Sequence, residues 1–400
     1  MWSADKIKRV AIICGYSFPE GLAATTRILS YGKGFVENGI KTDIFVYFPT
    51  DSQPSSFSAD GEIYGINYHY PGTREHPKNK IIRILSHAYY CFIAVFKLLK
   101  ENKKEKFDFV IISSDWFRIL YVFIPVVKLI NSRPIFITDE YPVPIRVYLK
   151  NSIPKYKETL FKNILKYVKG MIFMTDNLSS FYNGFVEKPS YILPTLTDVS
   201  RFSGIPPNYN GPRYLCYMGN MELSKDNVDN IISAFKTISE KYDDLELHLY
   251  GPPSPNDLKR IAALIDKLEL HTRVILKGKV SNDKVPGILL NSFILVSSQP
   301  PTKRAEGGFP TKLGEYMASG KPTLLTNVGE ISKFVTDGVN CWLAIPNDPI
   351  DYGKKLEYII DNYPEALKVG ERARAYILEN FDYNVQCIKL INFLDKLMKN

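Results

Sequence analysis

The sequence predicts an α/β protein made of two consecutive doubly wound domains, each a parallel sheet covered by helices. Short runs rich in β-branched and aromatic residues alternate with longer stretches of helical apolar spacing along most of the chain. This alternation stops at 201–213, a segment dense in glycine, proline and asparagine, and then starts again. The length of 400 residues suits two or three domains.

Strand candidates on both sides of the break define the expected domains, 1–200 and 214–382, with 201–213 as the linker. Those before the break are 9–15, 42–48, 66–70, 107–113, 133–139, 170–175 and 190–194, with a helical stretch near 25–38 after the first. Those after it are 213–219, 245–251, 273–278, 293–298, 321–326 and 340–346, with helices near 228–241, 256–268, 283–290 and 310–319. Such alternation builds a parallel sheet in each domain.

The segment 349–400 is expected to form three helices. In the last of them, 383–400, the apolar spacing of Cys387, Ile388, Ile391, Leu394 and Leu397 predicts one buried face. In a two-domain fold, a tail of this kind can pack back on the first domain.

The composition is that of a soluble globular protein with a basic balance. Apolar residues make up 45% and charged residues 23%, and the formal net charge is +9. Such a charge attracts phosphorylated substrates or an anionic membrane surface. Nucleic acid is disfavoured, because the basic residues are scattered and form no known binding motif. The five cysteines lie far apart without a CxxC pair, so we expect buried thiols in a reducing, cytoplasmic setting.

Two apolar stretches, 81–99 and 116–130, raise the question of a membrane. Each is interrupted by charge or is shorter than the roughly 20 apolar residues of a spanning helix, so buried helices are expected. No signal peptide is recognised at the start of the chain. The lysine-rich segment 97–106 can still contact anionic headgroups, which would make the protein peripheral at the inner face of the membrane.

The most informative stretch is EGGFPTKLGEYMASGKP, at 306–322. Gly307 and Gly308 allow the backbone to approach a ligand, Pro310 suits the first helical position, and Gly320 closes the helix. Free amides at the start of this helix would bind an anion, and Glu315 could accept hydrogen bonds from ribose hydroxyls. A plain loop-to-helix junction with an exposed glutamate remains the alternative.

This stretch, followed by VGE, resembles the donor-site signature of glycosyltransferase family 4 (group 1), retaining enzymes of the GT-B fold. The resemblance implies two Rossmann-like domains facing a central cleft, with a nucleotide-sugar donor on the second. Of the family's two glutamates, the second matches Glu315 and would bind the donor ribose, while the first position falls on Gly307. The neighbouring Glu306 is an open substitute. The backbone at Gly307, Gly308, Phe309, Pro310 and Thr311 would face the donor diphosphate.

A second motif, YMGNMELSKDNVD, follows the strand candidate 213–219. By the same resemblance Gly219 opens the donor loop, Asn220 stands where a basic or polar residue contacts phosphate, and Lys225 is the phosphate lysine. A solvated surface lysine is the alternative. The loops at 251–253 and at Gly278–Val280 would read the base, which the residues do not identify, although a UDP- or GDP-sugar is the expected donor.

The first domain should bind the acceptor. Gly21, Ala23 and Ala24 follow the first strand candidate and resemble the family's acceptor-side loop. Asp139 and Glu140 follow the strand candidate 133–139 and are the catalytic candidates, because many family members carry a histidine here and this chain does not. These two carboxylates can equally be turn formers.

The chain lacks the sequence motifs of several other enzyme classes. The chain has no GxGxxG, HExxH, GxSxG or Walker sequence and no persuasive DxD, so we expect no metal and no cofactor besides the donor substrate. The sequence therefore indicates a retaining glycosyltransferase acting on a glycan, lipid-linked or other hydroxyl acceptor, in surface polysaccharide or glycoconjugate synthesis. The alternative is an inert GT-B protein that binds a nucleotide-sugar or a partner transferase. An epimerase or a phosphorylase on the same scaffold is a further rival, although a phosphorylase would need a pyridoxal lysine and a longer chain.

Overall fold

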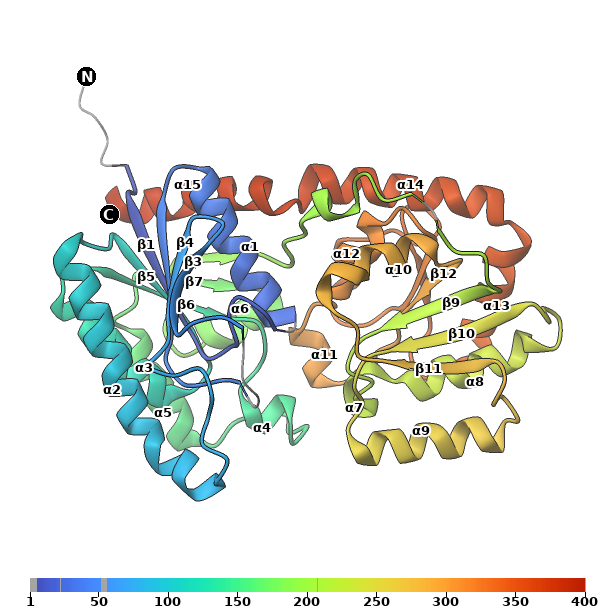
Figure 1. The fold of residues 1–400 in the computed structure, drawn as a ribbon, viewed down its shortest axis with the longest axis horizontal. Helices are drawn as coiled ribbons and strands as arrows, with labels where there is room; N and C mark the ends of the chain where they lie inside the picture. The colour runs from blue at the N-terminus through green and yellow to red at the C-terminus, as the bar shows by residue number, and fades with distance from the viewer. Residues whose placement is uncertain (1–5, 22, 52–55, 207, 400) are drawn as a thin grey trace. The chain divides into compact units, whose positions relative to one another are not determined.

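The computed structural model describes residues 6–21, 23–51, 56–206 and 208–399. Its internal contacts divide the chain into two units (Figure 1). The N-terminal unit comprises the chain up to Leu196 together with Tyr383–Asn400, and the C-terminal unit is Thr197–Asp382. Each unit holds one largely parallel sheet with helices packed on it, which confirms the predicted doubly wound α/β class.

The sheet of the N-terminal unit has the order β3-β4-β2-β1-β5-β6-β7-β8. Its strands are β1 (Arg9–Cys14), β2 (Lys41–Val46), β3 (Asp60–Ile63), β4 (Ile66–His69), β5 (Phe109–Ser113), β6 (Arg133–Thr138), β7 (Gly170–Phe173) and β8 (Ser190–Ile192). All pairs are parallel except β3 with β4. The edge strand β3 was not predicted, because its half-exposed sequence DGEI lacks an apolar run.

Alternate residues of β1 explain why helices cover both faces of this sheet. Val10 and Ile12 belong to a buried cluster with α1 (Ala23–Glu37) and α15 (Tyr383–Lys399). Ala11 and Ile13 belong to a second cluster on the opposite face. That cluster is built with α2 (Lys80–Lys104), α3 (Phe117–Leu129), α4 (Val143–Arg146), α5 (Lys155–Leu165) and α6 (Asp176–Asn183).

The C-terminal helix α15 packs directly on α1 within the N-terminal unit. A Cβ atom at Gly34 would lie 2.3 Å from the Cys387 sulfur, so only glycine permits this approach. Cys387, Leu394 and Leu397 are buried as predicted, but the inclusion of Ile388 in the buried face was wrong, because its side chain is exposed.

The sheet of the C-terminal unit has the order β11-β10-β9-β12-β13-β14 and is parallel throughout. Its strands are β9 (Arg213–Met218), β10 (Leu245–Tyr250), β11 (Val274–Gly278), β12 (Ile294–Val296), β13 (Thr323–Thr326) and β14 (Trp342–Ala344). Its α-helices are α7 (Leu223–Asp226), α8 (Val228–Ser239), α9 (Pro255–Lys267), α10 (Val285–Asn291), α11 (Lys303–Gly307), α12 (Lys312–Ala318), α13 (Pro349–Asp361) and α14 (Tyr363–Asn380). The 3-10 turns are η1 (Val199–Phe202), η2 (Asn282–Lys284) and η3 (Ile331–Lys333).

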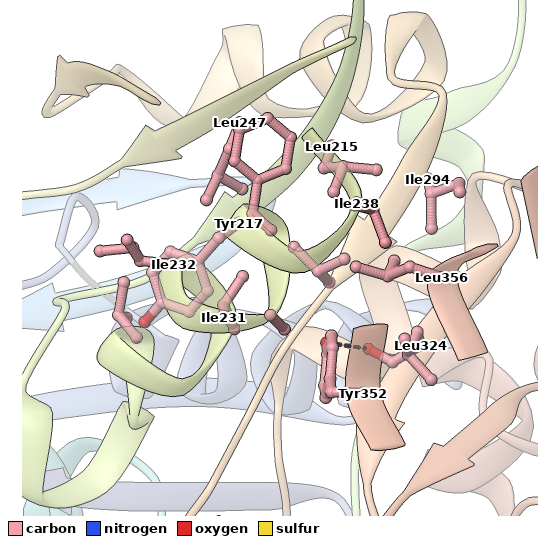
Figure 2. Close-up of a cluster of buried hydrophobic side chains, with 14 of the residues drawn as sticks. Leu215, Tyr217, Ile231, Ile232, Ile238, Leu247, Ile294, Leu324, Tyr352 and Leu356 are labelled. Atoms are coloured by element: carbon pink, nitrogen blue, oxygen red, sulfur yellow. Dashed lines mark hydrogen bonds between the residues drawn. The ribbon is translucent and has the colours of Figure 1, made fainter. Parts of the chain in front are cut away.

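Figure 2 shows the core of this unit, where side chains of β9 and β10 meet those of α8 and α13. Tyr352 of α13 is fully buried, and its hydroxyl donates to the carbonyls of Leu324 (3.0 Å) and Ser297 (3.1 Å). A buried phenol needs such partners, because an unpaired hydroxyl in the core costs free energy. These bonds tie α13 to the ends of β12 and β13.

All five cysteines are buried and none forms a disulfide, as expected of small core residues.

The two apolar stretches behave differently. The stretch 116–130 forms α3, whose Leu120, Phe123 and Val127 lie in the core, as predicted. The prediction of a buried helix at 81–99 was wrong, because α2 exposes most of its large apolar side chains. The number of apolar residues in a helix does not reveal whether a neighbouring element covers their side chains.

A buried ion pair joins the first two strands. Asp43 on β2 is 1% exposed and accepts from Arg9 Nε (2.9 Å) and Nη2 (3.0 Å), and His69 Nε2 lies 3.2 Å from it. Burial alone would raise the pKa of Asp43, but the hydrogen bonds from His69 and Arg9 outweigh burial and lower it.

We expect Asp43→Ala to lower the free energy of unfolding by about 3–5 kcal/mol in urea titrations, because it leaves Arg9 charged and buried. Asp244→Ala is the control; its exposed pair with Arg213 should be worth under about 1 kcal/mol. The depressed folded pKa means that the contribution of Asp43 is present above the ordinary aspartate pKa and disappears as pH falls through the folded value. An unchanged midpoint for Asp43→Ala would contradict this account.

Candidate functional site

Three glycines lie in a row at the carboxyl ends of neighbouring strands in the C-terminal unit. Gly219 follows β9, Gly251 follows β10 and Gly278 ends β11. The Gly219 amide donates to the Tyr250 carbonyl and the Gly251 amide to the Gly278 carbonyl, both at 2.9 Å. Gly251 has φ +133°, and a Cβ there would lie 1.7 Å from the Gly219 carbonyl oxygen. The structure therefore brings together three loops that the sequence had singled out separately.

These loops surround the point where the strand order reverses. β9 has β10 on one side and β12 on the other, so the chain leaves β9 and β12 in opposite directions. Ligands of open α/β sheets bind outside the carboxyl ends of the strands at such a point. Gly219 occupies it directly, with the exposed Asn220 next to it.

Lys312, which the sequence analysis had not singled out, reaches this point from α12. Its ammonium lies 2.8 Å from Asp226 Oδ1, 3.2 Å from the Tyr217 hydroxyl and 4.4 Å from the centre of the Tyr217 ring. A Cβ at Gly219 would lie 2.7 Å from the same ammonium, so the glycine makes room for it. The signal was present, since Lys312 stands inside the GGFPTKLGE motif at the start of a helix.

Asp226 and Lys312 alter each other's pKa. Burial lowers the pKa of Lys312, and the attraction of Asp226 offsets only part of this. Burial would raise the pKa of Asp226, but Lys312 outweighs it and the pKa falls, with Lys225 adding to the effect. Lys225, on α7, shifts the pKa of both groups in the direction expected of a nearby positive charge. Lys312 and Lys225, the predicted phosphate lysine, are the lysine cluster of this unit.

The stretch 306–315 differs from its prediction in local geometry. Gly307 ends the short helix α11, whose first turn is capped by the Thr302 hydroxyl, and neither Gly307 nor Gly308 adopts a left-handed conformation. Phe309 is buried against Phe334. Pro310 is not the first helical residue, because α12 begins at Lys312 with Thr311 as its cap.

The end of α12 agrees with the prediction. Gly320 has φ +73° and its amide donates to the Met317 carbonyl, as a helix-closing glycine does. α12 has seven residues and brings Lys312 and Glu315 within one turn of each other.

Glu315 forms an ion pair with Arg201 (2.5 Å), a residue the sequence analysis had left in the linker. Arg201 lies in η1 and also donates to the backbone oxygen of Asn282 (2.6 Å) and to its side-chain oxygen (3.0 Å). The Glu315 side chain is about a quarter exposed. A ribose hydroxyl that bonds Glu315 would therefore share it with a guanidinium.

A small cavity lies at the carboxyl ends of β12 and β13, beside Pro310. It is lined by Ser297, Gln299, Pro310, Leu325, Thr326, Val328 and Ile331. Gln299 and Thr326 close one side by exchanging two hydrogen bonds, of 2.8 and 3.0 Å. The cavity therefore adjoins the backbone that was predicted to face the diphosphate.

In the N-terminal unit the corresponding reversal of strand order lies between β1 and β5. Asp115 follows β5, and Asp139 and Glu140 follow the adjacent β6. Arg146 of α4 binds Glu140 (2.9 Å) and Asp115 (3.3 Å), while Arg27 of α1 lies 3.1 Å from Asp139. Asp115, Arg146 and Arg27 were not predicted, although Asp115 could have been found by the rule that singled out Asp139.

These carboxylates have perturbed acidities. Burial raises the pKa of Asp139 and outweighs the opposing Arg27. The pKa of Asp115 is raised in the same way, against the opposing Arg146. Perturbed carboxyls at strand ends are typical of functional sites.

The predicted acceptor loop also lies after β1. Gly21 is exposed, and a Cβ there would lie 2.1 Å from the Thr25 hydroxyl, which donates to the Ser17 carbonyl. Ala23 is the first residue of α1, and Leu22 lies outside the described residues. Among the described residues, no three His, Cys, Asp or Glu side chains are grouped so that they could hold a metal ion.

Two relatives match different shares of the chain. The poly(ribitol-phosphate) alpha-N-acetylglucosaminyltransferase of Staphylococcus aureus is 24% identical over 202 residues, which are 50% of this chain and 39% of that protein. An uncharacterized glycosyltransferase of Methanocaldococcus jannaschii is 24% identical over 394 residues, covering 94% of this chain and 95% of the relative.

Solved structures share the fold at low identity. Sucrose-phosphate synthase from Thermosynechococcus elongatus aligns with TM-score 0.74 and 16% identity over 98% of this chain and 99% of its own. HepE of Anabaena in complex with UDP aligns with TM-score 0.68 and 13% identity over 96% of this chain and 100% of HepE. The fold is therefore the two-domain GT-B fold.

A family match falls on the unit that carries the glycine loops and the lysine cluster. Residues 199–376 match the family described as Glycosyl transferases group 1. This range includes Gly219, Lys225, Lys312 and Glu315. The C-terminal unit of this chain is therefore similar to the group 1 glycosyl transferases over these residues.

Proposed function

We propose that this protein transfers a sugar from a nucleoside diphosphate sugar to a hydroxyl acceptor with retention of anomeric configuration. The observation that carries the proposal is the Lys312 ammonium at the strand reversal of the C-terminal unit, which Asp226 holds beside Gly219. A diphosphate would accept charge-assisted hydrogen bonds from this ammonium and from Lys225. The family match and the UDP complex of HepE favour a UDP-sugar, with a GDP-sugar as the other expected donor.

In this proposal the donor ribose bonds Glu315, and the diphosphate lies against the lysine cluster and the backbone from Gly308 to Thr311. The acceptor oxygen attacks the anomeric carbon on the face that the diphosphate leaves. The bond from that carbon to the phosphate oxygen breaks, and the acceptor proton passes to the departing phosphate. Lysine charges would stabilise the leaving group, so no metal is invoked.

The acceptor is assigned to the N-terminal unit, at the loop of Gly21 and Ala23 and at Asp139 and Glu140. A glycan or lipid-linked hydroxyl is the expected class, in surface polysaccharide or glycoconjugate synthesis. The S. aureus relative is named for transfer to poly(ribitol-phosphate), a polymer of this kind. Cysteines that form no disulfide accord with a cytoplasmic setting.

The donor site is tested by thermal unfolding with UDP-, GDP-, ADP- and CDP-sugars. A ligand at about 100 times its dissociation constant should stabilise the wild type by about 2.7 kcal/mol. Lys225→Ala and Glu315→Ala should each weaken binding by roughly 10–100-fold, because each removes a charged hydrogen-bonding group. Lys259→Ala and Glu371→Ala, exposed residues of the same unit, are the controls. If no nucleotide sugar shifts the wild type at millimolar concentration, the donor site is wrongly assigned.

A second candidate, an inert nucleotide-sugar binder, is favoured by one observation. The usual first-glutamate position is Gly307, and the neighbouring Glu306 is ion-paired with Lys303 at 2.7 Å. Donor binding without hydrolysis or transfer to any acceptor would support this reading. Slow donor hydrolysis by the wild type would exclude it.

A further inference from the structure

Helix α2 presents an uncovered apolar row to solvent. Ile81, Leu85, Tyr89, Phe92 and Phe96 are each between 61% and 73% exposed. Their spacing of three and four residues places them along one side of the helix. Ile82 and Ile84 beside them are also exposed. A continuous apolar surface of this kind on a folded unit marks an interaction site.

The opposite side of α2 belongs to the core of the N-terminal unit. Cys91, Ala94 and Leu98 are buried in the cluster that covers the sheet. His87 stacks on Phe48 with ring centres 4.8 Å apart. Figure 1 shows α2 at the margin of this unit, with the sheet and α3 to one side of it. The helix is therefore amphipathic, with one face committed to the protein.

Charge surrounds this row and is almost entirely positive. Residues 84–96 carry no charged side chain, while eight basic residues and two acidic ones lie elsewhere in 78–106. The basic residues are Lys78, Lys80, Arg83, Lys97, Lys100, Lys103, Lys104 and Lys106. Both acidic residues are in ion pairs, Glu101 with Lys104 and Glu105 with Lys41, and Lys97 is paired with Asp60. Lys100 and Lys103 continue the spacing of the apolar row beyond Phe96.

We propose that α2 binds the surface of a bilayer containing anionic lipids, lying in the headgroup region with the row from Ile81 to Phe96 inserted. Aromatic and aliphatic side chains would enter the acyl boundary, and the flanking lysines would contact phosphate headgroups. The positive flanks at both ends of the row complement an anionic lipid surface, which selects this occupant over an uncharged protein groove.

The helix lies on the bilayer and does not cross it. α2 is the one helix among the described residues that is long and apolar enough to span a membrane. If α2 crossed the bilayer, Cys91, Ala94 and Leu98 would leave the core of the N-terminal unit and contact lipid. A surface orientation keeps both faces in their preferred surroundings. The proposal concerns membrane binding and is independent of the donor site.

The test is sedimentation of the full chain with vesicles of phosphatidylcholine alone or mixed with phosphatidylglycerol. The wild type should pellet with the mixed vesicles and be released by high salt. Leu85→Ser/Phe92→Ser/Phe96→Ser should lower the partition coefficient at least ~10-fold, since each change removes apolar surface from the lipid. Lys100→Glu/Lys103→Glu should abolish the preference for anionic vesicles.

Matched controls lie in the C-terminal unit. Ile345→Ser/Ile350→Ser/Tyr358→Ser removes three comparably exposed apolar side chains, and Lys259→Glu/Lys267→Glu reverses two exposed helical lysines. Both should pellet like the wild type, and all variants should keep the wild-type melting temperature and donor stabilisation. The proposal is overturned if the wild type ignores anionic vesicles, if the triple change on α2 binds like the wild type, or if only detergent releases the protein. Donor binding, measured separately, would survive such a failure.

Discussion

Replacing Lys312 by methionine is expected to lower turnover by roughly 10²–10³-fold, the usual cost of removing one preorganised group that stabilises transition-state charge. Lys312 is aimed at the Gly219 loop and is held there by Asp226 at 2.8 Å. Lys312→Met also removes the ammonium that is ion-paired with the buried Asp226 carboxylate. We therefore expect the free energy of unfolding to fall by about 3 kcal/mol as well, because a broken buried pair leaves an uncompensated charge.

A double variant separates the two effects. Lys312→Met/Asp226→Asn removes both charges of the pair, and such neutral replacements commonly restore stability. In urea titrations the double variant should regain most of the free energy of unfolding that Lys312→Met loses. Calorimetry with the nucleotide sugar should still show weaker binding than in the wild type. If the double variant also recovers donor binding and turnover, Lys312 acts only on the fold. If Lys312→Met alone has wild-type activity, the lysine cluster is not the diphosphate site.

Asp139→Asn should have the next largest effect, on transfer and not on donor binding. Asp139 would orient the acceptor hydroxyl, and we expect its loss to cost roughly 10²-fold in transfer rate, as misplacement of a reacting group does. Glu140→Gln, measured beside it, distinguishes which of the two carboxylates acts. Glu187→Gln, an exposed carboxylate of the same unit, should be neutral. Equal losses of donor affinity and transfer rate would indicate damage to the fold instead of a role in the reaction.

The pH dependence of the transfer rate is a second test of the role of Asp139. Burial raises the pKa of Asp139 above its usual value in spite of Arg27, so the carboxylate forms only at higher pH than an ordinary aspartate. Transfer that needs this carboxylate should fall on the acid side, and Asp139→Asn should remove that limb. The same raised pKa means that the folded state binds more protons than the unfolded state. The contribution of Asp139 to stability is therefore greatest at acid pH and decreases as pH rises through the folded value.

Most strands could be predicted because each is a short buried run between turn residues. All thirteen expected strands are present, and the missing one, β3, has alternating half-exposed residues at a sheet edge. Short helices were harder to predict. α11 covers five residues, KRAEG, with no apolar period to reveal it, and its presence moves Gly307 from a loop to a helix end.

The candidate site was predicted where a motif carries it and missed where folding assembles it. Lys225 and Glu315 were found in their motifs. Asp226 and Arg201 were not, because their importance comes from partners far along the chain, Lys312 for Asp226 and Glu315 for Arg201. Nothing in the local sequence marks a residue that will be paired only after folding.

The sequence alone determined the doubly wound class and the glycine loops, because backbone propensity, strand patterning and turn chemistry act over a few residues. Only the tertiary structure decided which lysine reaches Gly219, which arginines hold Asp139 and Glu140, and that α2 is uncovered. Burial and ion pairing depend on what packs against a residue, and that is set by contacts between distant segments. The sequence pattern of an apolar helix is the same whether its outer face contacts protein or solvent.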